Sequence, residues 1–226
     1  MWSSDVQQRG FAIIPGILSR AETVPLLDSL AREPLERTKA GIRHVLTRAG
    51  VAQLAQDARL VEIARGVLGD GAFPFHATLF DKSPTANWLV VWHQDTALPI
   101  RVRREAAGWG PWSVKNGVTY AHAPASALTQ ILALRVHLDD SNSGNGPLRV
   151  LPGTHTLGVL TDGEIHGLCT TVSAFECVVP EGGVLAMRPL IVHSSSKSEA
   201  EAPRRVLHIE YAASKALGDG LELAIA

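Results

Sequence analysis

The hydrophobic pattern of the first third of the chain is typical of helices. A short apolar run at Phe11–Ile14, which we interpret as a strand, precedes Ser19 and Glu22, whose spacing fits a capping box in which the two side chains satisfy exposed backbone N–H groups. Apolar residues follow at helical spacing, namely Ala21, Val24, Leu27 and Leu30. A second helix is predicted over Ala49–Leu68, with Gly69 placed to end it.

From Phe73 onward the apolar runs become short and β-branched, with Gly, Pro, Asn and Ser between them. The predicted strands are Phe75–Asp81, Trp88–Gln94, Ile131–Leu138, Leu148–Leu151, Thr171–Val178, Gly183–Arg188, Leu190–Ser194 and Arg205–Tyr211. Many short strands separated by turn signals are typical of a β-sandwich or barrel. We therefore expect a mainly β fold with flanking helices, organised as a single domain over residues 1–226.

The segment Ile100–Ser126 does not fit this pattern. It is longer than an ordinary connection, and long loops inside compact domains are usually functional or disordered. Its charged and aromatic residues, set among Gly and Pro, are Arg101, Arg103, Arg104, Trp109, Trp112 and Lys115. The two Trp residues argue against disorder, so we interpret the segment as a lid that shapes selectivity, with a packed structural loop as the alternative.

Composition and charge exclude several classes of function. Of the 226 residues, 46% are hydrophobic and 19% are charged, which is ordinary for a globular protein. The net charge of -1 provides no basic field to attract nucleic acid or an anionic membrane. The N-terminal residues lack the features of a signal peptide, and Cys169 and Cys177 are too few for a disulfide framework. We expect a cytoplasmic protein that binds neither nucleic acid nor membranes, and its oligomeric state is not indicated.

His93 and Asp95 form the first candidate metal-binding pattern. Residues two apart on a strand point the same way, so an imidazole and a carboxylate would lie side by side. Iron(II) oxygenases bind their metal with two His and one carboxylate on one face and leave the other positions open. The second His would come from a distant strand. His193, where an apolar run becomes polar, is the best candidate, and His137 and His208 are alternatives.

A dicarboxylate co-substrate such as 2-oxoglutarate would need a cation for its far carboxylate. Arg supplies a planar, two-pronged donor for this purpose. Arg204 and Arg205 open the last strong strand, and strand alternation would send only one of them inward. Arg135 and His137 share a face of their strand, which could be the inner face or an outward polar one.

Several motifs recur in a fixed order from about Phe73 to Tyr211. They are Lys82-Ser83-Pro84 leading to Trp92-His93-Gln94-Asp95, Leu138-Asp139-Asp140 leading to Asn145-Gly146-Pro147-Leu148, Leu151-Pro152-Gly153-Thr154-His155, and His193-Ser194-Ser195 followed by Arg204-Arg205. In this combination the chain resembles the phytanoyl-CoA dioxygenase family. The resemblance implies a double-stranded β-helix (jelly-roll, cupin-like) core that uses Fe(II), 2-oxoglutarate and O2.

The resemblance also assigns roles to individual residues. It implies that His93, Asp95 and His193 are the metal ligands, and that Arg204, not Arg205, binds 2-oxoglutarate. Ser195 and Lys82 resemble further contacts to this co-substrate. Because related halogenases replace the carboxylate ligand with a small residue, retention of Asp95 favours hydroxylation of a small organic molecule, with release of succinate and CO2. The alternatives are a cupin-like metal enzyme that does not use 2-oxoglutarate and a non-catalytic 2-oxoglutarate-binding protein.

Overall fold

Two antiparallel sheets facing each other form the core of the protein. The computed structural model describes residues 2–33, 41–84 and 86–225. A six-stranded sheet has the order β1-β11-β8-β13-β3-β2, and a four-stranded sheet has the order β10-β9-β12-β4. The strands of the large sheet are β1 (Phe11–Ile14), β2 (Ile42–Arg43), β3 (Phe73–Lys82), β8 (Ile131–His137), β11 (Val184–Met187) and β13 (Arg204–Ala212). Those of the small sheet are β4 (Val90–His93), β9 (Leu148–Val150), β10 (Phe175–Cys177) and β12 (His193–Ser195). The expected jelly-roll core is confirmed.

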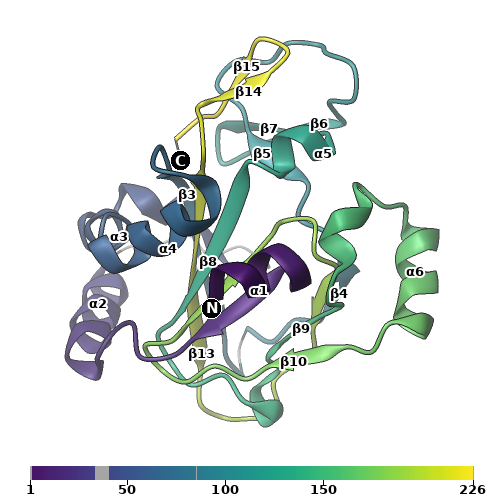
Figure 1. The fold of residues 1–226 in the computed structure, drawn as a ribbon. Helices are drawn as coiled ribbons and strands as arrows, with labels where there is room; N and C mark the ends of the chain where they lie inside the picture. Colours follow the sequence, from purple (N-terminus) through teal and green to yellow (C-terminus); the bar gives the residue numbers. More distant parts are fainter. Residues whose placement is uncertain (1, 34–40, 85, 226) are drawn as a thin grey trace.

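Helices cover the outer face of the large sheet (Figure 1). They are α1 (Trp2–Arg9), α2 (Arg20–Arg32), α3 (Ala49–Ala55) and α4 (Ala58–Leu68), with a 3-10 turn at Val45–Thr47. Because side chains alternate along a strand, Leu132, Leu134 and Val136 of β8 all point outward. They are fully buried in one cluster with the helical residues Leu60 and Ile63. The helices therefore cover one face of the large sheet, and its opposite face points toward the small sheet and forms the interior between them.

The single helix predicted over Ala49–Leu68 is wrong in one respect, because the segment forms two helices, α3 and α4. The break falls at Asp57, whose carboxylate accepts a hydrogen bond from the backbone N–H of Arg59 and so caps α4. An N-cap residue takes an extended backbone conformation, which interrupts the preceding helix. The apolar periodicity continues through the break, and it therefore conceals the cap.

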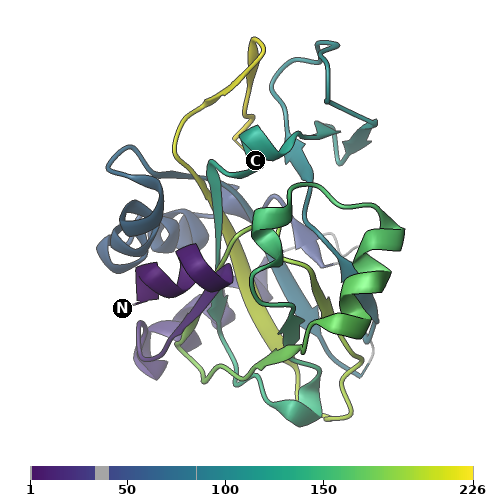
Figure 2. The same cartoon turned by 45° about the vertical axis from the view of Figure 1, so that its right-hand side comes forward.

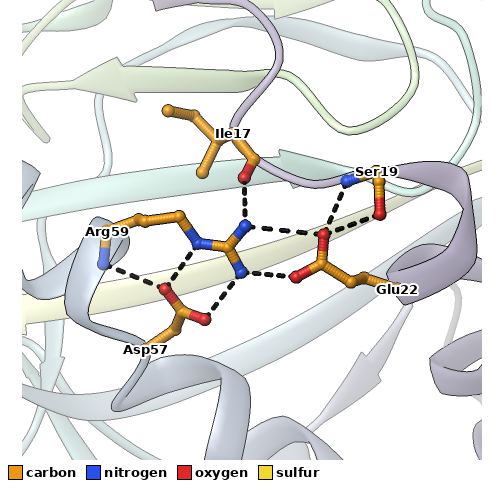
Figure 3. Close-up of polar contacts among 5 residues, drawn as sticks. All are labelled: Ile17, Ser19, Glu22, Asp57 and Arg59. Atoms are coloured by element: carbon orange, nitrogen blue, oxygen red, sulfur yellow. Dashed lines mark hydrogen bonds and ion pairs between the residues drawn. The ribbon is translucent and has the colours of Figure 1, made fainter.

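Arg59 joins this break to the start of α2 (Figure 3). Its guanidinium donates to both carboxylate oxygens of Asp57, to Glu22 and to the backbone carbonyl of Ile17. Glu22 also accepts from the backbone N–H and the hydroxyl of Ser19, which confirms the capping box. The hydrogen bonds from Arg59 and then Ser19 lower the pKa of Glu22 to about 2.

Two predicted strands need correction. Thr171 ends helix α6 (Asp162–Thr171), so the strand predicted over Thr171–Val178 is limited to β10. The strand predicted over Leu190–Ser194 begins only at His193. The helices α1 and α6 were not expected. Helix α6 packs beside the small sheet (Figure 2). Its residue Ile165 forms a buried cluster with Leu151 and Val192.

The segment 100–126, which we interpret as a lid, has regular structure. It contains β6 (Trp112–Lys115), β7 (Val118–His122) and the start of α5 (Ala125–Leu128), and β7 pairs with both β6 and β5 (Ala97–Pro99). Trp109 is buried in a cluster with Leu217 and Leu221. The latter two belong to the hairpin β14 (Ala216–Gly218) and β15 (Leu221–Glu222), which lies beside this small three-stranded sheet at the top of Figure 1.

Two further 3-10 turns, Ser143–Asn145 and Thr154–Leu157, flank β9. Among the residues that the structure describes, no helix combines the length and hydropathy needed to cross a bilayer.

Candidate metal centre

His93, Asp95 and His193 converge between the two sheets. His93 ends β4, and His193 begins β12 directly opposite it in the strand register. Asp95 follows β4, where its backbone N–H donates to the carbonyl of Pro189. The Nε2 atoms of His93 and His193 lie 3.5 and 3.4 Å from the two carboxylate oxygens of Asp95. One donor atom from each residue lies within 4.8 Å of the others, which is close enough for all three to hold one metal ion.

Backbone hydrogen bonds set the tautomer of both imidazoles. His93 Nδ1 lies 2.9 Å from the carbonyl of Val91, and His193 Nδ1 lies 2.9 Å from the carbonyl of Ile191. A carbonyl can only accept, so each Nδ1 must carry the proton and each neutral Nε2 presents a lone pair. Metal-binding histidines are commonly oriented by this kind of contact. The donor set therefore fits a cation.

The electrostatics of Asp95 and His193 also suit a metal. Burial lowers the pKa of His193 to about 4, so this imidazole is neutral near pH 7. Burial would raise the pKa of Asp95, but the nearby His193 and His93 lower it overall. Burial alone would lower the pKa of His93, but its contact with Asp95 raises the pKa above its usual value on balance. A deprotonated carboxylate and a neutral imidazole are the forms that bind metals.

The alternative histidines lie elsewhere. His208 Nδ1 is 3.1 Å from the guanidinium of Arg135. Both ring nitrogens of His137 are buried without a hydrogen-bond partner among the described residues. Within the described ranges, the trio of His93, Asp95 and His193 is the sole grouping of at least three His, Cys, Asp or Glu residues that could hold a metal ion.

The strand register arranges the inner face of the large sheet in rows. Alternate residues of β3, β8 and β13 point toward the small sheet. The rows are His76 with Glu210, then Thr78 and His208 with Arg135, then Phe80 and Val206 with His137, and last Lys82 with Arg204. Arg135 and His137 thus lie on the inner face, which decides between the two orientations that the sequence allowed.

A cavity of about 230 Å³, which we call the cationic cavity, lies between these rows and the candidate metal centre. All three candidate metal ligands line it, so the donor atoms and the cations share one space. Four cations line it, namely Arg43, Lys82, Arg135 and Arg204. The last three are buried and Arg43 is partly exposed, and the carboxylate among the lining residues is that of Asp95. Such a cavity suits an anionic ligand, because buried charges require opposite charges or hydrogen bonds.

Arg204 and Arg205 differ as strand alternation requires. Arg204 faces the cationic cavity, and its Nε donates to the backbone carbonyl of Asn145 at 3.1 Å. Arg205 faces the other way and forms two hydrogen bonds of 2.7 Å to the carboxylate of Asp139. Burial and the proximity of Arg135 lower the pKa of Arg204 to about 10, so it remains charged near neutral pH.

Lys82 connects the two sheets at this end. Its ammonium donates to Ser195 Oγ at 2.8 Å and to the backbone carbonyl of Ser196. Ser195 Oγ in turn donates to the carbonyl of Gly146, so its hydroxyl proton is already engaged. Burial and the positive charges of Arg204 and Arg135 lower the pKa of Lys82 to about 7. Ser195 therefore contributes to the cavity by holding Lys82.

Two other lining residues were not singled out as site residues. The guanidinium carbon of Arg135 lies 5.1 Å from the centroid of the Phe80 ring, and this ring makes a T-shaped contact with the ring of His208. Arg43 reaches the cavity from β2. Phe80 lies two residues before Lys82 and therefore shares its face of β3, so strand alternation could have identified it. The sequence around Arg43 contains no comparable signal.

The chain is similar to two enzymes in sequence. It is 28% identical over 138 residues to an ectoine dioxygenase of Sphingopyxis alaskensis, covering 61% of this chain and 38% of that relative. It is 25% identical over 186 residues to an L-proline trans-4-hydroxylase of Streptomyces griseoviridis, covering 71% of this chain and 62% of that relative. The matches thus span less than two thirds of the length of either relative.

Solved structures and a family model extend the likeness. The apo form of EctD from S. alaskensis superposes with a TM-score of 0.71 at 20% identity, covering 96% of this chain and 79% of that one. The α-ketoglutarate-dependent epimerase SnoN from nogalamycin biosynthesis superposes with a TM-score of 0.68 at 19% identity, covering 93% and 80%. At such identities the likeness is one of fold. The model of the phytanoyl-CoA dioxygenase (PhyH) family matches residues 6–206, and the chain belongs to this family.

Proposed function

We propose that the protein is an Fe(II)- and 2-oxoglutarate-dependent dioxygenase that hydroxylates a small organic molecule. The observation that carries this proposal is the convergence of two Nε2 lone pairs and a carboxylate beside a cation-lined cavity. Two His and one carboxylate with open positions are typical of non-haem iron oxygenases. The phytanoyl-CoA dioxygenase family and the two similar enzymes support the same activity.

The residues of the site would divide the work. His93, Asp95 and His193 would hold Fe(II), which supplies the activation of O2 that places one oxygen atom in succinate and the other in a C–H bond of the substrate. Arg204 and Lys82 would bind the far carboxylate of 2-oxoglutarate, because they lie in one row at the end of the cavity. Tight placement of the reactants in a partly closed cavity contributes to the rate.

The cationic cavity also separates this proposal from the alternatives. A cupin-like metal enzyme without 2-oxoglutarate would not need Lys82 and Arg204, which are costly to bury together without an anion. A binding protein without catalysis would be expected to lack a complete ligand set, whereas all three candidate ligands are present here.

The test is succinate formation from 2-oxoglutarate with Fe(II), ascorbate and a panel of small organic molecules. We expect substrate-stimulated succinate from the wild type and none from His93→Ala. His166→Ala, which changes an exposed histidine of α6, is the matched control and should retain activity. Full turnover by His93→Ala would refute the metal assignment, and binding of 2-oxoglutarate without any succinate would favour the non-catalytic reading.

A further inference from the structure

A second cavity of about 230 Å³, which we call the polar cavity, adjoins the candidate metal centre at Asp95. The two cavities share Arg43, Phe80 and Asp95, so both adjoin the carboxylate ligand. The row of Lys82 and Arg204 closes the cationic cavity at one end, whereas the row of His76 and Glu210 lies at the polar cavity. If 2-oxoglutarate occupies the first, the second is the space from which a C–H bond can reach the same metal.

The size and walls of the polar cavity limit what can enter it. Its volume is below the roughly 300–1,000 Å³ of pockets for drug-sized ligands. Most of the residues that line it are polar, and Phe80 and Ala97 are the apolar ones. A hydrocarbon chain would shield the charges of Lys115, Arg43 and Glu210 from water without pairing them, which is costly. A small polar compound fits, and a long acyl chain does not.

One wall is fixed by a chain of hydrogen bonds. His76 Nδ1 lies 2.7 Å from Glu210 Oε2, Tyr120 Oη lies 3.1 Å from His76 Nε2, and His44 Nε2 lies 2.9 Å from Tyr120 Oη. With His76 neutral, Nδ1 donates to Glu210, Tyr120 donates to Nε2, and His44 donates to Tyr120. This order uses one proton at each link. The wall is therefore satisfied without a ligand and holds Tyr120 in place.

Lys115 stands against this wall. Its ammonium lies 4.8 Å from the centroid of the Tyr120 ring. Among the residues that the structure describes, no carboxylate lies within ion-pair distance of Lys115 Nζ. Burial and then the positive charge of Arg43, which lines the same cavity, lower the pKa of Lys115, and the more distant carboxylates of Asp95 and Glu210 oppose this shift only in part. Lys115 and Arg43, as cations at one cavity, can together bind an anionic group.

We infer that the prime substrate is a small polar compound with an anionic group, of the carboxylate class, that binds Lys115 and Arg43 in the polar cavity. This inference rests on the proposed function. The remainder of the molecule would face Glu210, which lines the cavity and suits a hydroxyl or amine donor. Lys115 would act as a specificity-determining residue, because an uncharged analogue would leave its partly buried ammonium without an anion.

The experiment compares small carboxylic acids, including amino and hydroxy acids, with their neutral primary amides and with phosphate monoesters. Substrate-stimulated succinate formation is measured at saturating Fe(II) and 2-oxoglutarate. We expect acids to stimulate and their amides to remain inactive. Stimulation by phosphate monoesters and not by carboxylates would overturn the carboxylate class, and stimulation by amides, or by no acid, would overturn the inference as a whole.

Variants of Lys115 test the residue itself. For an acid that stimulates, Lys115→Met should raise KM by at least about tenfold with a smaller change in kcat, since the lost contact is one to bound substrate. Lys115→Arg should recover much of the loss. Lys215→Met removes the same kind of charge from an exposed lysine that lines neither cavity, and it should leave KM unchanged. An unchanged KM in Lys115→Met would overturn the inference.

The dissociation constant of 2-oxoglutarate, measured by calorimetry with Mn(II) in place of iron, distinguishes failure of the proposed function from failure of the proposed substrate class. If the wild type fails to bind 2-oxoglutarate, the proposed function fails. If it binds 2-oxoglutarate and only neutral compounds stimulate succinate formation, the function stands and the substrate class is wrong.

Discussion

His93 and His193 occupy opposing positions in the register of β4 and β12, with their ring centroids 4.3 Å apart. Each ring donates from Nδ1 to the backbone carbonyl of the residue two positions earlier in the chain. The same local contact thus turns both Nε2 atoms toward Asp95. The geometry depends on strand pairing, so it is set by the fold and not by the metal.

Removing one imidazole should remove the metal. We expect His193→Ala to weaken binding of Fe(II) or Mn(II) by more than about 100-fold, since loss of a ligand should cost more than the roughly 10–100-fold typical of outer contacts. Calorimetry under anaerobic conditions measures this. His137→Ala removes a histidine outside the trio, and an equal loss of metal affinity in that variant would contradict the assignment.

Arg204 and Arg205 provide a test from adjacent positions. Arg204→Ala should weaken binding of 2-oxoglutarate by about 2–5 kcal/mol, because it removes a buried cation from its carboxylate. Arg205→Ala should leave that affinity unchanged, because Arg205 binds Asp139 on the other face of β13. The measurement is the dissociation constant of 2-oxoglutarate with Mn(II). The reverse pattern would show that the opposite face of β13 holds the co-substrate.

Lys82 should make co-substrate binding dependent on pH. Its pKa of about 7 in the ligand-free protein should rise when a dianion binds beside it. Below pH 7 the ammonium is already charged. Above pH 7 binding must take up a proton, so the affinity should fall as the pH rises, by at most about tenfold per pH unit. The affinity is measured between pH 6 and 9.

Lys82→Arg is the control for this dependence, because a guanidinium stays charged throughout that range. Its affinity for 2-oxoglutarate should vary less with pH than that of the wild type. An identical slope in both proteins would assign the titration to another group.

Gly146 should resist substitution for two separate reasons. Its φ of 66° is left-handed, and an added Cβ would press against the carbonyl of Ser196. Gly153 has a φ of 84° with nothing near its Cβ position, so Gly153→Ala isolates the conformational cost, about 1–2 kcal/mol. Gly146→Ala should lower the free energy of unfolding further, as measured with urea, and should weaken 2-oxoglutarate binding through Ser195. Equal effects in the two variants would exclude the steric contribution.

Glu22 should contribute to acid stability through Arg59. Its pKa falls from 4.5 to about 2 in the folded protein, so its contribution is complete above about pH 4.5 and is lost as the pH falls toward 2. The difference in unfolding free energy between wild type and Glu22→Gln should therefore shrink over that interval. Glu62→Gln, which removes a carboxylate at an exposed position of α4, is the matched control.

The sequence predicts the strands of the large sheet well because their apolar faces are continuous. It fails at the second helix, where the cap at Asp57 interrupts an unbroken apolar period. It also fails over 100–126, where the lid interpretation overlooked a local signal: Asn116 and Gly117, both at positive φ, form the two-residue turn between β6 and β7. Strand β5 is three residues long and depends on pairing with β7, and such tertiary contacts leave little trace in local composition.

The metal trio could be predicted in part. Strand alternation places His93 beside Asp95, but the choice of His193 over His137 and His208 came from the family resemblance. All three histidines lie on strands, and local sequence does not indicate which sheet a strand joins. The direction of Arg204 likewise required the register of β13 against β3. The hydrogen-bond chain through Tyr120 involves residues up to 134 positions apart, so no local pattern reveals it.

The buried cations in the inner rows of the large sheet destabilise the ligand-free folded protein. Lys82, Arg135 and Arg204 repel one another inside a cavity where apolar side chains would otherwise pack. Ligands that bind only the native state stabilise it by mass action. Loading with metal and a dianion should therefore protect the chain against heat and proteolysis, so that its lifetime depends on the supply of both.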